Sequence, residues 1–243
     1  MIIVTRPSPE GEVLTQQLIE AKIPAQHLPL FNISTGNDLF NLPSELTKLK
    51  PSDIVIVTSP QVTYIIKNNL PNLLLPTNIQ YFAVGNKSAK LFSQLTNSII
   101  SYPKQEDSEG LLQLLEEISL KNRSVLILRG DTGRPLLVNT LTHQKAKVKL
   151  IECYRRNPIL YPPNILADHI EKQVIISTST EHLLQLEAYC HNKHKQQANL
   201  IVTSWRIFAK AKCLNWQKVL LIDGANNQIL FKTIITLCHN ASI

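Results

Sequence analysis

The chain opens with the stretch Ile2-Ile3-Val4-Thr5-Arg6-Pro7-Ser8-Pro9. Its three consecutive apolar residues predict a short buried strand, which Arg6 and Pro7 bring to an end. Ser8 followed by Pro9 predicts a helix with the serine as N-cap and the proline in the first helical position. The chain therefore begins as strand, tight turn and helix, with an arginine at the carboxyl end of the strand. That end is where open α/β sheets bind their ligands.

A second copy of this pattern lies near the middle of the chain, in Val125-Leu126-Ile127-Leu128-Arg129-Gly130-Asp131-Thr132-Gly133-Arg134. Other segments match as well, for example Thr58-Ser59-Pro60-Gln61 and Thr178-Ser179-Thr180-Glu181. Apolar runs alternate with helical stretches throughout, which is typical of parallel sheets covered on both faces. We predict an α/β fold with two flavodoxin-like, doubly wound parallel-sheet domains, related by a pseudo-repeat and joined by a two-strand linker. The expected strands cover residues 2–4, 26–30, 53–57, 79–84, 98–102, 124–128, 148–154, 174–178, 200–203 and 218–222.

The repeat is compatible with two assemblies. In one, residues 1–120 form the first domain and residues 123–243 the second. In the other, residues 37–153 close on themselves and residues 1–31 complete the domain built from 163–243. Both satisfy right-handed crossovers, so the repeat alone leaves the choice open.

The composition restricts the class of protein. No apolar run approaches the roughly 18 residues of a membrane helix, and no signal peptide precedes the first strand. Four cysteines, widely spaced, indicate a reducing cytoplasm. The net charge of +7 indicates an anionic partner. Nucleic acid would be one such partner, but the lysines are dispersed and form no basic arm, so we expect no nucleic acid and no membrane among the partners.

A small polar cluster follows each expected strand. In a parallel sheet these clusters share one edge and coincide with helix N-termini, where free N–H groups favour anions. Each serine or threonine taken alone is better explained as a helix cap, so the collective placement is the stronger signal. Two such edges facing each other would line a cleft. The clusters are Thr5-Arg6, Thr58-Ser59, Asn86 to Ser88, Asp107-Ser108, Arg129 to Arg134, Thr178 to Thr180, Thr203-Ser204 and Asn226-Asn227.

Other chemistries find little support in the sequence. The turn from Gly130 to Gly133 lacks the G-K-[ST] ending of a phosphate-binding loop, and no G-x-G-x-x-G or G-x-S-x-G motif is present. His191 and His194 near Cys190 indicate a solvated helix end rather than zinc, and we expect no metal.

Tyr154 ends the last strand before a polar, proline-rich stretch. Its phenol could point into a cleft and donate a proton, or the side chain could simply pack against a domain.

Taken in order, the motifs resemble the uroporphyrinogen-III synthase family over nearly the whole chain. They are Thr5-Arg6-Pro7, Thr58-Ser59, Ala83-Val84-Gly85-Asn86-Lys87-Ser88-Ala89, Ser108-Glu109-Gly110-Leu111-Leu112, Arg129-Gly130-x-x-Gly133-Arg134, Tyr154-Arg155, Ser204-x-Arg206 and Gly224-Ala225-Asn226-Asn227. The resemblance implies the second assembly, with a discontinuous domain of residues 1–33 and 161–243, a contiguous domain of 37–153, and linkers at 32–36 and 154–162.

The resemblance also implies a function. The family closes hydroxymethylbilane, a linear polycarboxylate tetrapyrrole, with inversion of the terminal ring and loss of water, and it needs no cofactor. The implied acid is Tyr154. The implied substrate-binding residues are Arg6, Thr58, Ser59, Asn86, Ser88, Arg129, Ser179, Ser204, Arg206 and Asn227. The implied setting is a cytoplasmic monomer that receives the bilane in a transient handover from hydroxymethylbilane synthase.

Two positions depart from the family pattern. Ser88 replaces the usual threonine and keeps the hydroxyl, whereas Ile207 stands at the matching position of the second copy and has none. The alternative interpretation of the whole chain is a non-catalytic two-domain protein that closes on a small anionic ligand.

Overall fold

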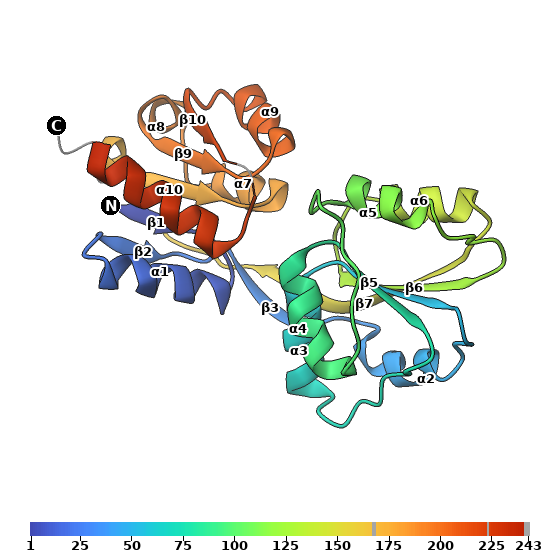
Figure 1. Cartoon of the computed structure of the whole chain (residues 1–243). Coiled ribbons are helices and arrows are strands. Elements are labelled where there is room, and N and C mark those ends of the chain that lie inside the picture. The colour runs from blue at the N-terminus through green and yellow to red at the C-terminus, as the bar shows by residue number, and fades with distance from the viewer. Residues whose placement is uncertain (167–168, 223, 241–243) are drawn as a thin grey trace. The chain divides into compact units, whose positions relative to one another are not determined.

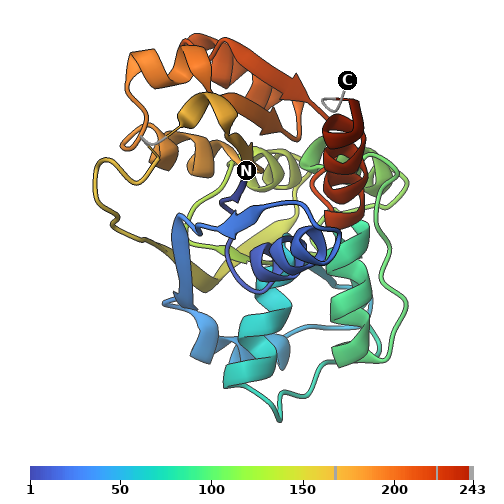
Figure 2. The ribbon, with the colours of Figure 1, turned by 90° about the vertical axis from the view of Figure 1, so that its left-hand side faces the viewer.

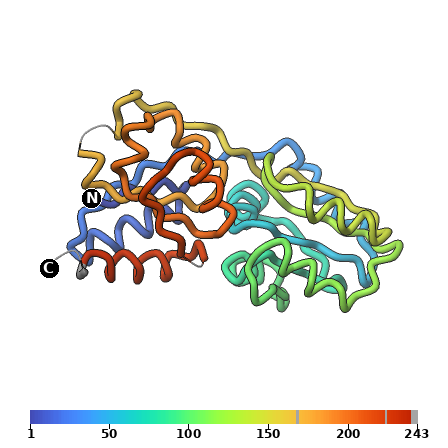
Figure 3. Tube along the Cα trace, turned by 90° about the horizontal axis from the view of Figure 1, so that it is seen from above, coloured from blue at the N-terminus to red at the C-terminus, as the bar shows by residue number. Residues whose placement is uncertain are grey.

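The computed structural model describes residues 1–166, 169–222 and 224–240. The chain divides into two compact units: unit 1 consists of Met1–Asn32 with Asn157–Ile243, and unit 2 of Ile33–Arg156. The chain passes from one unit to the other in β3 (Phe31–Thr35) and again in β7 (Lys147–Pro158), which are neighbours in one sheet. The two ends of the chain therefore belong to the same unit, as the blue and red segments of Figure 3 show.

Unit 1 is built on a sheet with the strand order β10-β9-β8-β1-β2. Its pairs are parallel, and Val4 of β1 lies between Ile176 and His27. The strands are β1 (Ile2–Val4), β2 (Ala25–His27), β8 (Val174–Ser177), β9 (Asn199–Val202) and β10 (Lys218–Leu221). The helices are α1 (Glu10–Glu20), α7 (Thr180–Leu186), α8 (Asn192–Gln197), α9 (Trp205–Cys213) and α10 (Asn227–Asn240), with a 3-10 turn η2 (Ile170–Lys172).

Successive residues of the unit 1 strands point to opposite faces, which gives the sheet two apolar layers. Ile3 and Ile175 belong to the layer that also contains Leu183 of α7. Val4 and Ile176 belong to the other layer, under α1 and α10, which pack side by side (Figures 1 and 2). Because both faces are covered at the centre of the sheet, β1 is an uninterrupted apolar run, as the sequence predicted, whereas the edge strands β2 and β10 are partly exposed.

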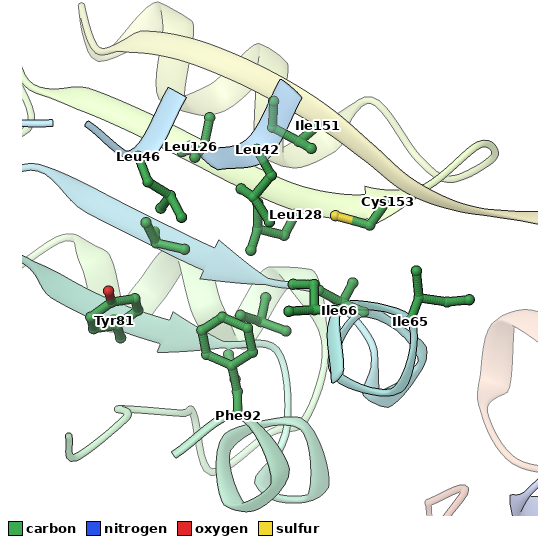
Figure 4. Close-up of a cluster of buried hydrophobic side chains, with 14 of the residues drawn as sticks. Leu42, Leu46, Ile65, Ile66, Tyr81, Phe92, Leu126, Leu128, Ile151 and Cys153 are labelled. Carbon is green, nitrogen blue, oxygen red and sulfur yellow. The ribbon is translucent and has the colours of Figure 1, made fainter. Parts of the chain in front are cut away.

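Unit 2 has the strand order β3-β7-β6-β4-β5. The parallel strands β4 (Ile54–Val57), β5 (Gln80–Ala83), β6 (Ser124–Gly130) and β7 form its centre. The helices are α2 (Leu42–Leu46), α3 (Pro60–Asn69), α4 (Asn86–Thr96), α5 (Ser108–Leu115) and α6 (Leu136–His143), with a 3-10 turn η1 (Leu39–Asn41). Figure 4 shows Leu126 and Leu128 of β6 on the same side as Ile66 of α3 and Phe92 of α4, in one buried cluster.

The predicted α/β class with parallel sheets is confirmed. The two sheets have the same strand order when β1 of unit 1 is aligned with β6 of unit 2: β2-β1-β8-β9-β10 corresponds to β7-β6-β4-β5. This strand order is the one expected of doubly wound sheets. The duplication itself stays a prediction. Along the described ranges, no helix is long and apolar enough to cross a bilayer.

Several local predictions were wrong. The strand expected at 98–102 is a single bridge between Phe82 and Ser101, because Asn97 ends α4 in a left-handed conformation and Ile99 is exposed. Ser8 is not the N-cap of α1: the helix begins at Glu10, and the Ser8 hydroxyl donates to Glu12 Oε1 at 2.6 Å.

Local contacts set the boundaries of three further elements. The cap of α5 is Asp107, whose Oδ1 accepts from the Gly110 N–H at 2.8 Å, so this helix spans Ser108–Leu115. The stretches after residues 31 and 154, predicted as a two-strand linker, are parts of β3 and β7, which satisfy their backbone groups by pairing with each other.

Candidate functional site

The carboxyl ends of β4, β5 and β6 meet at one edge of the unit 2 sheet, and predicted site residues follow each of them. Thr58, after β4, uses its hydroxyl to donate to the Leu128 carbonyl of β6 at 3.1 Å. Ser59 is the N-cap of α3 and accepts from the Gln61 N–H at 3.2 Å. Both side chains therefore have structural partners and shape the edge.

The N-terminus of α4 already holds a carboxylate. The Asn86 N–H donates to Glu106 Oε2 at 3.0 Å, and a Cβ on Gly85 would lie only 2.5 Å from the same oxygen. The glycine thus lets an acidic group approach the free N–H groups of the helix, where the helix dipole favours negative charge. Ser88 is buried in the first turn of α4.

Arg129 lies at the end of β6 and is half-buried. Its Nε donates to the Gly130 carbonyl at 3.1 Å, and neither of its terminal nitrogens has a hydrogen-bond partner among the residues that the structure describes. The guanidinium packs over Gly133, whose φ of +151° and close contact with Arg129 Nη2 leave no room for a side chain. The arrangement leaves two fixed N–H donors available to an anion.

Tyr154 lies opposite Gly130, at an irregularity in the register of β6 and β7. Its side chain is 1% exposed and belongs to the large apolar cluster of unit 2. The Tyr154 hydroxyl accepts from Arg156 Nη2 at 2.7 Å, and the guanidinium carbon lies 4.9 Å from the ring centre. Tyr154 is therefore packed by its ring and held at its polar end by an arginine.

Arg156 is fixed in turn by the loop that follows β6. Its Nη1 donates to Thr132 Oγ1 at 2.7 Å and lies 3.5 Å from Asp131 Oδ1, and its backbone N–H donates to Asp131 Oδ2 at 3.3 Å. The Asp131 N–H donates to the Tyr154 carbonyl at 2.9 Å. Asp131 was predicted only as a member of the cluster from Arg129 to Arg134, and Arg156 was not among the predicted site residues. The available signal was that residues two apart on a strand share a face, which places Arg156 beside Tyr154.

Two further residues of β7, Glu152 and Cys153, have shifted pKa values. The Arg155 guanidinium, 2.8 Å from Glu152 Oε1, lowers the pKa of the Glu152 carboxyl. Burial raises the pKa of the Cys153 thiol to about 12, so that this cysteine is an inert apolar side chain.

The equivalent edge of unit 1 is arranged differently. Arg6 Nη1 donates to Asn227 Oδ1, and Asn227 Nδ2 donates to the Glu10 carbonyl at 3.0 Å. The two predicted substrate-binding residues thus bind each other and tie β1 to the start of α10. His27 Nε2 lies 2.8 Å from the Arg6 carbonyl and adds a further link at this edge.

The remaining unit 1 candidates stand at helix starts. Ser179 accepts from the His182 N–H at 3.1 Å and Ser204 from the Ile207 N–H at 3.4 Å, so both are N-caps. Arg206 is exposed in the first turn of α9, and Ile207 is buried with 2% exposure. The site candidates are thus divided between the sheet edges of two units, with Arg6 on one and Arg129 on the other.

Neither clustered metal ligands among the described residues nor two open hollows on the surface compete with this site. In the part of the chain that is described, no three His, Cys, Asp or Glu side chains come together as a metal would require. One hollow of about 450 Å³ lies between α1 and α10, and another of about 300 Å³ lies where β6 and β7 begin. Neither is lined by a predicted site residue.

Comparison with known proteins identifies relatives along the whole chain. Residues 12–229 match the family model described as "Uroporphyrinogen-III synthase HemD". The uroporphyrinogen-III synthase of Escherichia coli K12 is 33% identical over 243 residues, covering 96% of this chain and 99% of that protein. That of Proteus mirabilis is 34% identical and covers 84% of this chain and 98% of its own.

Solved structures share the fold. A mutant uroporphyrinogen III synthase from the extremely thermophilic bacterium Thermus thermophilus superposes with a TM-score of 0.66 at 13% identity, covering 98% of each chain. The Helicobacter pylori 26695 enzyme gives 0.61 at 16% identity, covering 88% of this chain and 93% of that one.

Proposed function

The chain belongs to the uroporphyrinogen-III synthase family, and we propose that it converts hydroxymethylbilane to uroporphyrinogen III by the residues at its two sheet edges. The terminal hydroxyl is protonated and leaves as water, and the substituted carbon of the last ring attacks the resulting cation to give a spiro intermediate. The bond from that carbon to its original methylene bridge then breaks, and this methylene bonds to the free carbon of the inverted ring with loss of a proton. The observation that carries the proposal is the match to two curated synthases at 33% and 34% identity over 96% and 84% of the chain.

Substrate recognition in unit 2 is carboxylate recognition. Arg129 supports this proposal, because its two terminal nitrogens are held at the sheet edge with no partner among the described residues. The N-terminus of α4 supports it as well, since the Asn86 N–H already binds the Glu106 carboxylate. A propionate or acetate group of the bilane would replace Glu106 there, and Thr58, Ser59 and Ser88 line the same edge.

Tyr154 is the general acid of the proposal. A phenol that protonates the departing hydroxyl would accelerate the reaction by about 10²-fold or less, because the pyrrole already expels the hydroxyl readily and most of the catalysis is conformational. Tyr154 is 1% exposed, so contact with substrate requires a movement at this edge that leaves the hydrogen bond between Arg156 and the phenol intact.

Unit 1 contributes binding without acid chemistry. Ser179 and Ser204 present helix N-termini with their capping hydroxyls, and the exposed Arg206 stands close to Ser204 as a cation for a carboxylate. Arg6 and Asn227 bind each other, which favours a structural role for both. Ile207 offers no hydroxyl where the family usually has threonine.

The test is direct. The purified protein is supplied with hydroxymethylbilane, the products are oxidised, and the isomers are separated. The free bilane closes to isomer I, so the proposal expects predominant isomer III. A product mixture that contains isomer I alone would refute catalysis and leave the alternative, a non-catalytic protein that binds a small anion.

We further propose that the protein works as a monomer in the cytoplasm and receives the bilane by transient handover from hydroxymethylbilane synthase. The support is chemical, because a released bilane would be lost to isomer I. In a coupled assay, dilution at a fixed ratio of the two enzymes should lower the share of isomer III. Sedimentation at micromolar concentration should give a single species of 27.4 kDa.

A further inference from the structure

We propose that Arg156 is the positioning residue for Tyr154: it fixes the phenol so that its hydroxyl hydrogen is directed away from the protein and toward the substrate. The inference rests on the proposed role of Tyr154 as general acid. It adds a residue that neither the sequence motifs nor the family resemblance assigned.

The direction of the hydrogen bond carries the inference. A guanidinium has only donors, so the 2.7 Å contact makes the Tyr154 oxygen an acceptor from Arg156 Nη2. The phenol hydrogen must then lie on another side of the oxygen. Among the residues that the structure describes, none accepts it, so the proton remains available for donation.

Arg156 is itself rigid enough to serve this purpose. Its Nη1 donates to Thr132 Oγ1 at 2.7 Å, and Asp131 binds both its backbone N–H and its side chain. The guanidinium also lies over the ring, 4.9 Å from its centre, which limits rotation of the phenol.

Arg155 provides a matched control. It is the adjacent arginine on β7, carries the same charge, is 44% exposed in its side chain, and pairs with Glu152 instead of Tyr154. Substitution of either arginine by glutamine removes one positive charge from the same strand. Only the change at position 156 removes the donor to the phenol.

The experiment compares R156Q, R155Q, Tyr154→Phe and the double variant R156Q/Tyr154→Phe in the formation of isomer III. We expect R156Q to lower kcat about tenfold with KM changed less than about threefold, because a misplaced acid affects the transition state more than binding. R155Q should keep the kcat of the original protein. The double variant should have the kcat of Tyr154→Phe, because a positioning residue has nothing to position once the hydroxyl is gone.

Other results would overturn the inference or its premise separately. A rise in KM with unchanged kcat in R156Q would make Arg156 a substrate contact, and independent losses in the double variant would exclude action through Tyr154. An unchanged kcat in Tyr154→Phe would show that Tyr154 is not the general acid, which refutes the premise of the inference. If R156Q does not fold by circular dichroism, Thr132→Val loosens Arg156 from the exposed loop instead. A smaller loss of kcat is then expected, and an unchanged kcat would refute the inference.

Discussion

Gly130→Ala should damage catalysis by displacing Tyr154, although the substitution removes none of the side chains that the proposal uses. A Cβ at position 130 would lie 2.7 Å from Cε2 and from Cζ of the Tyr154 ring, and 2.9 Å from Arg156 Nη1. Carbon atoms pack at about 3.5–4.0 Å, so the ring must retreat by about 1 Å. A displacement of about 1 Å in a reacting group can cost about 10²-fold in rate, and we expect kcat to fall by about 10- to 100-fold.

The assay measures the initial rate of isomer III formation over a range of hydroxymethylbilane concentrations. Overpacking should cost about 1–3 kcal/mol of stability, so folding is checked by circular dichroism before kinetics. Gly133→Ala is the matched change: its Cβ would press on the Arg129 guanidinium instead, so KM should rise more than kcat falls. A folded Gly130→Ala protein with kcat within about twofold of the original would refute the placement of Tyr154 in the reaction.

Three further predictions concern stability. Replacement of Asp107 by alanine removes the side-chain cap of α5 and should cost about 1 kcal/mol in urea unfolding, with no change in the isomer ratio; an unchanged midpoint would contradict the cap. Burial raises the pKa of the Cys190 thiol from 9.0 to about 12, so its contribution to stability is fully present below pH 9 and is lost as the pH rises toward 12. We expect the unfolding midpoint of the original protein to fall over this pH range, and that of a Cys190→Ala variant to fall less. An equal dependence of the midpoint on pH in both proteins would contradict the contribution of Cys190. Glu187→Ala leaves the buried Lys195 ammonium and the Trp216 indole N–H without their partner, at a cost of about 3–5 kcal/mol. The fluorescence of buried Trp216 should report an earlier transition in unit 1, and a midpoint equal to that of the original protein would refute the estimate.

The strands and the polar edge were predictable because each depends on local sequence. The run Val125 to Leu128 is apolar in every position, which only a strand covered on both faces accommodates. Ser59 and Ser179 precede helices at the expected positions, since a capping hydroxyl is a property of its own neighbourhood.

What could not be predicted depends on register and on competition between neighbours. The contact of Tyr154 with Gly130 requires the irregularity between β6 and β7, and no local pattern announces it. At the start of α1, Ser8 has a suitable side chain but is drawn to the Glu12 carboxylate.

The same competition decides which arginine is available to a ligand. Arg6 and Arg129 hold matching positions in the predicted repeat, each at the carboxyl end of a strand. Arg6 is occupied because α10 of unit 1 begins with Asn227, whose amide oxygen accepts the guanidinium. After β6 the chain instead turns through Gly133, and the Arg129 guanidinium packs against the backbone of this glycine. The terminal nitrogens of Arg129 have no acceptor among the described residues. Sequence similarity between the copies therefore does not imply shared function. Our proposal accordingly assigns anion binding to Arg129, whose terminal nitrogens have no partner among the described residues, and the acid role to Tyr154 on the neighbouring strand.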